Sequence, residues 1–181
     1  DLDKTFFVDL KKWFSEYQEL VFIPGVEKKE KVVQLLNKFI FLKTLEDHAL
    51  IPFNYIRETY EDKHNKWSSK GKKRVFAEFF NEINKWSYEY YDTELLKLDI
   101  FELLVQDENN LKTLQIATEK VLGLSLWDKT FGLGLIHYNY RNINEDIFGK
   151  AYETFLAEER KEHGIFYTPT DITEYMSRLL V

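Results

Sequence analysis

Apolar residues recur at spacings of three and four along most of the chain, as expected of helices that pack one face on a core. The first such stretch covers residues 6–17, and Pro24-Gly25 interrupts the pattern behind it. The second, residues 32–45, is apolar on more than one side, which predicts a central buried helix ending near His48. We expect Pro52 to be the first residue of a third helix, carried forward by Phe53, because a proline there loses no hydrogen bond.

A polar stretch separates this part from the next helices. Residues 61–74 are rich in charged side chains and predict a loop, after which helical spacing resumes over residues 75–91. The apolar segment 95–105 fits either a helix or a strand. Asn109-Asn110 indicates a further loop, and residues 111–122 predict a helix that ends at Gly123.

The C-terminal part has a different pattern. Residues 138–141 look extended, and Asn144 is placed to cap a helix with acidic residues in its first turn. Residues 165–169 then form a connecting segment that runs back along the chain's previous helix, and Thr170 caps a final helix. Together these patterns predict an all-α fold, a multi-helix bundle with a short extended segment before the C-terminal helices.

Composition narrows the class of protein. The chain has 181 residues, of which 44% are hydrophobic and 31% charged, with only 7 Gly and 3 Pro, so a packed globule fits and a disordered chain does not. The absence of Cys excludes a disulfide framework and a cysteine nucleophile and favours a cytoplasmic protein. No apolar stretch reaches the roughly 20 residues that cross a membrane, so we expect no membrane partner.

Few residues have the spacing of a catalytic or metal site. The four His residues show no metal-ligand spacing, and no metal is expected. Nucleophile-elbow, phosphate-loop and dinucleotide-binding motifs are absent from the sequence. The adjacent acids Glu46-Asp47, Glu145-Asp146 and Glu158-Glu159 diverge around a helix, so we interpret them as parts of solvated faces.

One basic patch stands out in a chain whose net charge is -6. That net charge is unlike an autonomous nucleic-acid binder, so any DNA contact has to be local. Within the patch, Lys70, Lys72, Lys73 and Arg74 are candidates for holding DNA phosphates. The alternative is a solvated loop between two helices, which the neighbouring Glu61 and Asp62 favour.

One motif carries a family resemblance. Residues 164–169, Gly-Ile-Phe-Tyr-Thr-Pro, are followed by Ile172 and Met176. This segment resembles the GxFYTPxxIxxxM signature that opens the methyltransferase domain of N6-adenine DNA methyltransferases from type I and type IIG restriction-modification systems. Residues 143–156 and 35–52 are similar to two helices that precede the signature in the same family.

The resemblance implies a cofactor site. In this family the signature closes over S-adenosylmethionine, and the residues matching Phe166, Tyr167, Thr168 and Pro169 line the cofactor. Their chemistry agrees, since Thr168 offers a hydroxyl and the aromatic rings suit a sulfonium. The alternative is that Phe166 and Tyr167 are core aromatics and Thr168-Pro169 is only a helix entry.

Motifs that should follow the signature are missing from the sequence. These are the glycine-rich loop and the [DN]PP[YF] motif that holds the flipped adenine. We therefore expect a fragment in which residues 1–137 are a helical connector and residues 138–181 begin the methyltransferase domain, without catalytic residues of its own. Its partners would be a catalytic domain in the same chain and, through the parent protein, DNA. The competing hypothesis is a standalone helical module that binds protein or DNA without a cofactor.

Overall fold

The computed structural model describes residues 2–85, 99–124 and 134–141, and these form helices. The five α-helices are α1 (Leu2–Glu16), α2 (Lys28–Asp47), α3 (Tyr55–Trp67), α4 (Lys72–Lys85) and α5 (Glu108–Leu122), and three 3-10 turns are η1 (Ser68–Lys70), η4 (Ile100–Leu103) and η5 (Leu135–His137). The described part of the chain holds no strand, only an isolated antiparallel bridge between Phe22 and Leu104. The predicted all-α class is confirmed.

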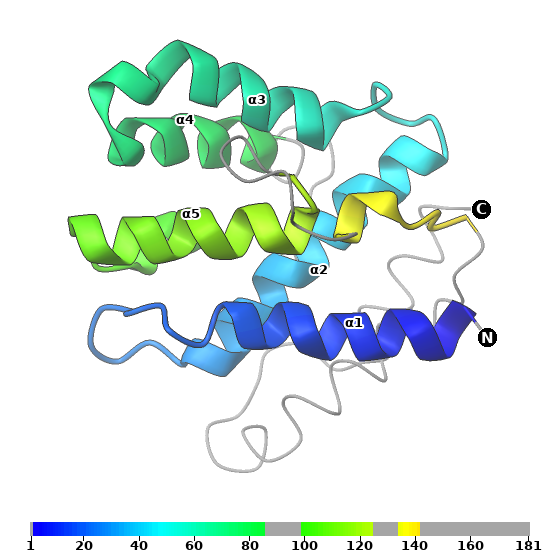
Figure 1. Ribbon diagram of the computed structural model, residues 1–181, viewed down its shortest axis with the longest axis horizontal. Coiled ribbons are helices and arrows are strands. Elements are labelled where there is room, and N and C mark those ends of the chain that lie inside the picture. The colour runs from blue at the N-terminus through cyan, green and yellow to red at the C-terminus, as the bar shows by residue number, and fades with distance from the viewer. Residues whose placement is uncertain (1, 86–98, 125–133, 142–181) are drawn as a thin grey trace.

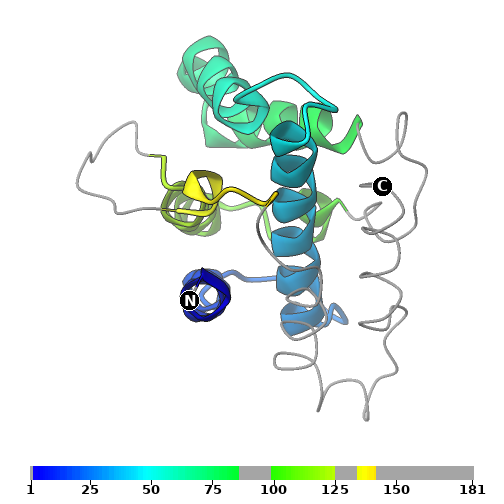
Figure 2. The same cartoon turned by 90° about the vertical axis from the view of Figure 1, so that its right-hand side faces the viewer.

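Four of the helices lie side by side. Figure 1 shows α1, α5 and the α3–α4 pair in succession, and α2 crosses behind them. In the orthogonal view of Figure 2, α2 runs along the group and α1 and α5 are seen nearly end-on beside it. None of the described helices is long and apolar enough to cross a membrane.

The crossing helix α2 is the centre of the core. Every residue from 32 to 42 is buried, on all sides of the helix, as its continuous apolar pattern predicts. The helix ends at Asp47 with His48 as its C-cap, which confirms the expected end. The prediction for α1 is also confirmed, because Phe6, Leu10 and Trp13 are buried in the same core.

The predicted start of α3 is wrong by three residues. Pro52 and Phe53 lie in the preceding turn, where Phe53 is 81% exposed, and Asn54 takes the left-handed conformation with φ 59°. The first turn of α3 is capped from a distance: the N–H of Ile56 donates to Glu46 Oε1 at 2.7 Å. Because α2 supplies this acceptor, the helix needs neither a proline nor a capping side chain at its own start.

The predicted loop over residues 61–74 is also wrong. Helix α3 continues to Trp67, η1 follows, and α4 begins at Lys72, with Gly71 at φ 98° between the two. The segment is polar because it forms the outer faces and the end of a helical hairpin, whose inner side buries Tyr60 and Phe76.

Asn109 and Asn110, predicted as a loop, lie inside the first turn of α5. Asp107 is the N-cap, and its carboxylate accepts from the Asn110 N–H at 2.8 Å. The predicted end of α5 is confirmed, since Gly123 is the C-cap with φ 79°. The apolar segment 95–105 fits either a helix or a strand by sequence. In its described part the structure has η4 and a short backbone pairing with residues 21–23.

Candidate functional site

The predicted cofactor residues Phe166, Tyr167, Thr168 and Pro169 lie in residues 142–181, outside the part that the structure describes. The acid pairs at 145–146 and 158–159 and the last residues, 86–91, of the helix expected over 75–91 also fall outside it. The described residues nearest to the signature along the chain are 134–141. Their contacts show how the last described residues before the signature are held on the helices.

Residues 134–141, here called the exit segment, are packed on α1 through aromatic rings. The Tyr138 and Tyr140 rings meet the Phe6 ring edge-on at centroid distances of 5.2 and 5.6 Å. The Tyr138 ring also meets Trp13 edge-on at 5.8 Å. Tyr140 is buried and its hydroxyl donates to the Leu135 carbonyl at 3.0 Å. Edge-to-face pairs of this kind add to the stability that burial alone gives.

Two carboxylates hold the exit segment from other helices. Asp47, at the end of α2, accepts the backbone N–H of Tyr140 at 2.8 Å, and it is ion-paired with Lys43. Asp9 on α1 accepts a hydrogen bond from the hydroxyl of Tyr138. Burial, together with the charge of Asp47, raises the pKa of Tyr140 well above its ordinary value, so this phenol stays neutral.

The exit segment begins at a close approach between two glycines. A Cβ on Gly123 would lie 2.5 Å from the backbone nitrogen of Gly134, and one on Gly134 would lie 2.1 Å from the nitrogen of Gly123. No side chain fits at either position. The end of α5 is therefore fixed against the start of the exit segment, while Asp47 and Asp9 hold the other end.

We expect the Asp47→Ala variant to loosen the exit segment selectively. Loss of the carboxylate removes the acceptor of the Tyr140 N–H, so hydrogen exchange of that amide should accelerate at least about tenfold. The amide of Leu114, deep in α5, should exchange as in the unchanged protein. Equal acceleration at both amides would mean that Asp47 supports the whole fold and not this segment in particular.

The interpretation of Glu46-Asp47 as a solvated pair is wrong. Glu46 is buried and Asp47 nearly so, and each accepts a specific backbone N–H from a different segment, Ile56 and Tyr140. Burial raises the pKa of Glu46 to about 7, although the Ile56 N–H and Lys43 oppose the shift. No sequence pattern points to these roles, because both partners are backbone groups.

The four basic candidates fall into two kinds. Lys72 is ion-paired with Glu108 at 3.0 Å, and Arg74 with Glu78 at the same distance. Lys70 and Lys73 are exposed at the end of the α3–α4 hairpin. The structure brings all four to one end of the hairpin, on helical backbone and not on the predicted loop.

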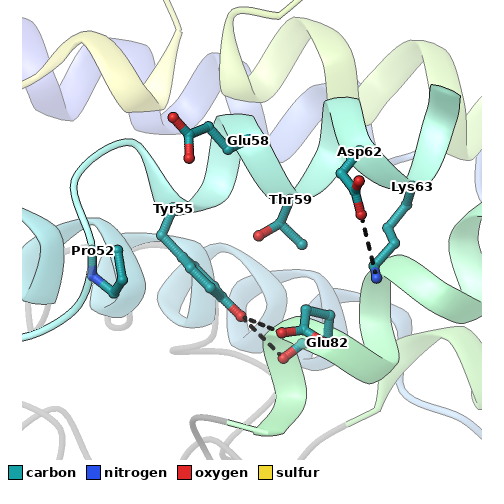
Figure 3. A pocket seen from close by; sticks show the side chains of 7 residues that line it. All are labelled: Pro52, Tyr55, Glu58, Thr59, Asp62, Lys63 and Glu82. Carbon is teal, nitrogen blue, oxygen red and sulfur yellow. Dashed lines mark hydrogen bonds and ion pairs between the residues drawn. The ribbon is translucent and has the colours of Figure 1, made fainter. Parts of the chain in front are cut away.

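A shallow pocket of about 540 Å³ lies along α3 and α4 and is lined by Pro52, Tyr55, Glu58, Thr59, Asp62, Lys63 and Glu82. Figure 3 shows the Tyr55 hydroxyl directed at Glu82, where it donates to the main-chain oxygen and to Oε1, both at 3.3 Å, and Lys63 beside Asp62 at 3.6 Å. The acidic lining of this pocket suits neither an anion nor DNA. Among the described residues no group of three or more His, Asp or Glu could hold a metal ion.

Buried hydroxyls join α3 and the turn after α1 to α5. Tyr60 donates to Glu119 Oε2 at 3.1 Å, and the Tyr17 hydroxyl shares a 3.0 Å hydrogen bond with Thr118 Oγ1. Burial raises the pKa of both phenols, so neither ionises near neutral pH. These groups are enclosed in the core and serve to join helices.

The known proteins that this chain is similar to agree with the family resemblance of the signature. Residues 143–181 match the family model described as N-6 DNA Methylase. The chain is also 30% identical, over an alignment of 171 residues, to a protein of Methanocaldococcus jannaschii whose name describes it as a candidate type II restriction enzyme and methyltransferase. The alignment covers 84% of this chain but 14% of that relative, so the chain spans about one seventh of the relative's length. No solved structure matches.

Both the matching family and the relative carry the name of a methylase or methyltransferase. The family match starts two residues after the exit segment ends and contains the whole signature, residues 164–169. The alignment with the relative extends over most of the chain and so takes in helical residues as well.

Proposed function

We propose that the chain is part of an S-adenosylmethionine-dependent adenine-N6 DNA methyltransferase, a cytoplasmic enzyme of a type I or type IIG restriction-modification system. Residues 1–137 would be a helical connector that packs on the catalytic domain of the same polypeptide, and residues 138–181 would begin the methyltransferase domain. The observation that carries the proposal is the family match over residues 143–181, which coincides with the signature.

Phe166, Tyr167, Thr168 and Pro169 would form one wall of the cofactor pocket, and their chemistry fits that group. An aromatic face attracts a sulfonium cation, and a threonine hydroxyl can both donate and accept a hydrogen bond. S-adenosylmethionine, when bound, supplies the methyl group. The residues that hold the flipped adenine would belong to the catalytic domain, because these 181 residues contain no [DN]PP[YF] motif.

In this proposal the helical connector positions the start of the methyltransferase domain through the exit segment. Asp9, Asp47 and the α1 aromatics fix residues 138–140 on the helical body. The position of the helices would therefore set where the methyltransferase segment starts. Binding energy at the cofactor wall is useful only if that wall is held in place.

Calorimetric titration of S-adenosylmethionine into the complete polypeptide tests the proposal. We expect clear binding, and at least tenfold weaker binding, about 1.4 kcal/mol, in the Tyr167→Ala, Thr168→Ala double variant. The Tyr55→Ala, Thr113→Ala variant is the matched control, since it makes the same two truncations in the helical body. Circular dichroism of each protein checks that it is folded.

The possible results separate the hypotheses. Equal weakening in both double variants, or no change in either, would make the signature a helix entry without cofactor contacts. Failure of the unchanged polypeptide to bind S-adenosylmethionine would contradict the methyltransferase and favour the standalone interaction module.

A further inference from the structure

We propose that the end of the α3–α4 hairpin, residues 66–74, binds the sugar–phosphate backbone of DNA without reading its sequence. This inference rests on the proposed function in naming DNA as the partner. It goes beyond that function in naming the surface and in separating the cations that bind phosphate from those that hold the hairpin together. We call residues 66–74 the hairpin tip.

The hairpin tip concentrates positive charge in an acidic chain. Residues 63–77 contain six Lys and Arg and no Asp or Glu, whereas the whole chain has 25 basic and 31 acidic residues. Helix α3 followed by α4 brings these cations to one end of the molecule, at the left of Figure 1. A local patch of this kind is the electrostatic footprint expected of a surface that binds phosphate.

Two of the cations are used within the protein. Lys72 joins α4 to α5 through Glu108 at 3.0 Å. Arg74 pairs with Glu78 at 3.0 Å, and its guanidinium lies 3.9 Å from the centre of the Trp67 ring. This stacking ties the last turn of α3 to the first turn of α4, so the tip is built as a rigid corner.

Lys70 and Lys73 are available for a partner. Both are exposed, and in the described part of the chain no carboxylate lies within ion-pair distance of either. Lys66, also exposed, is at the same corner, with its ammonium 6.0 Å from the Trp67 ring. The exposed hydroxyls of Ser68 and Ser69 add donors of the kind that position phosphates.

The surface fits DNA better than a protein partner. Protein interfaces have an apolar centre, whereas protein–DNA interfaces are polar and strongly positive. The large exposed hydrophobic residues of the described chain are Val8, Val21, Ile23, Leu50, Phe53 and Ile116, and none lies in the hairpin tip. The tip thus offers charge and hydroxyls to a partner but no apolar anchor.

The test is a binding titration of the complete polypeptide with a mixed-sequence DNA duplex of about 30 base pairs at several salt concentrations. The Lys70→Gln, Lys73→Gln variant should bind at least about tenfold more weakly near 0.1 M salt. The slope of log K against log salt concentration should fall in magnitude by about 2, close to one for each phosphate that is no longer neutralised. The Lys4→Gln, Lys12→Gln variant removes the same charge from α1, on the other side of α5, and should bind like the unchanged protein.

Methyl transfer from labelled cofactor to the adenine of plasmid DNA is measured in parallel, on the unchanged polypeptide. If the unchanged polypeptide methylates DNA but the tip variant keeps its affinity and salt slope, the surface proposal is overturned and the proposed function stands. An equal loss in the α1 variant would also overturn it, since net charge and not the tip would then govern binding. Absence of both DNA binding and methylation would contradict the proposed function itself.

Discussion

Replacing Asn110 by alanine should destabilise the fold by about 2–4 kcal/mol, although only one small polar side chain is removed. The Asn110 side chain accepts from the Val21 N–H at 2.8 Å and donates to the Val21 carbonyl at 2.7 Å and to the Val105 carbonyl at 2.6 Å. It thereby joins two loops, one of which lies 89 residues away from it along the chain. Alanine would leave three backbone groups without these partners.

Chemical unfolding in urea measures this destabilisation, and the neighbouring residue is the matched control. Asn109 is exposed on the same turn of α5, so Asn109→Ala should change the free energy of unfolding by no more than about 0.5 kcal/mol. Asn110→Asp keeps an acceptor for the Val21 N–H but has no donors for the two carbonyls, and it should also be strongly destabilising. An Asn110→Ala variant as stable as Asn109→Ala would show that water replaces the amide at no cost.

The fold could be predicted from the sequence where apolar spacing decided it. The stripes in α1, α2 and α5 are long, and burial follows them closely. The errors lie where a local signal was overridden by a distant contact. Asn109-Asn110 has the composition of a loop, but the Asn110 amide is used to join two other segments, and Asp107 caps the helix that contains it.

Charge was the other misleading signal. The run from Lys63 to Arg74 predicts a loop because nothing in it is strongly apolar except Trp67. A hairpin end needs few buried residues, because Tyr60 and Phe76 on either side already anchor the two helices. The helical hairpin becomes visible only when the pairing of α3 with α4 is known.

In the candidate site, too, sequence finds the contiguous motif, whereas contacts between distant residues become visible only in the structure. The signature at residues 164–169 is a contiguous motif, so sequence finds it directly, and the family match covers it. Asp47 and Tyr140 are 93 residues apart, and one partner is a backbone N–H that has no sequence signature. Lys72 and Lys73 are identical neighbours in sequence, yet only contact with Glu108 on α5 separates a structural cation from an exposed one.

The second large effect concerns a lysine enclosed in the core. Lys38 on α2 is 2% exposed, and its ammonium donates to Asn84 Oδ1 on α4 at 2.6 Å. The Asn84 Nδ2 is buried without a hydrogen-bond partner in the described chain. Burial lowers the pKa of Lys38 to about 7, while the negative charge of Asp99 opposes this shift.

A depressed lysine pKa makes stability depend on pH with a definite sign. In the unfolded chain Lys38 keeps an ordinary pKa near 10.5, and in the folded chain the value is about 7. Above pH 10.5 both states are neutral and no penalty exists. As the pH falls from 10.5 to 7 the unfolded state takes up the proton first, so the folded state is progressively disfavoured, and below pH 7 the penalty is constant.

The Lys38→Met, Asn84→Leu double variant should therefore be more stable than the unchanged protein by about 1–4 kcal/mol at pH 7, with a smaller gain at pH 10. The single variant Asn84→Leu should instead be destabilised, because it leaves the Lys38 ammonium without its Asn84 acceptor. Urea unfolding at pH 7, 8.5 and 10 gives all three comparisons. The raised pKa of Glu46 makes stability fall mainly as the pH rises from 4.5 to 7, below this range, and comparing the proteins at the same pH removes what remains of that effect. A gain that is the same at pH 7 and pH 10 would mean that Lys38 carries its proton in the folded core without penalty.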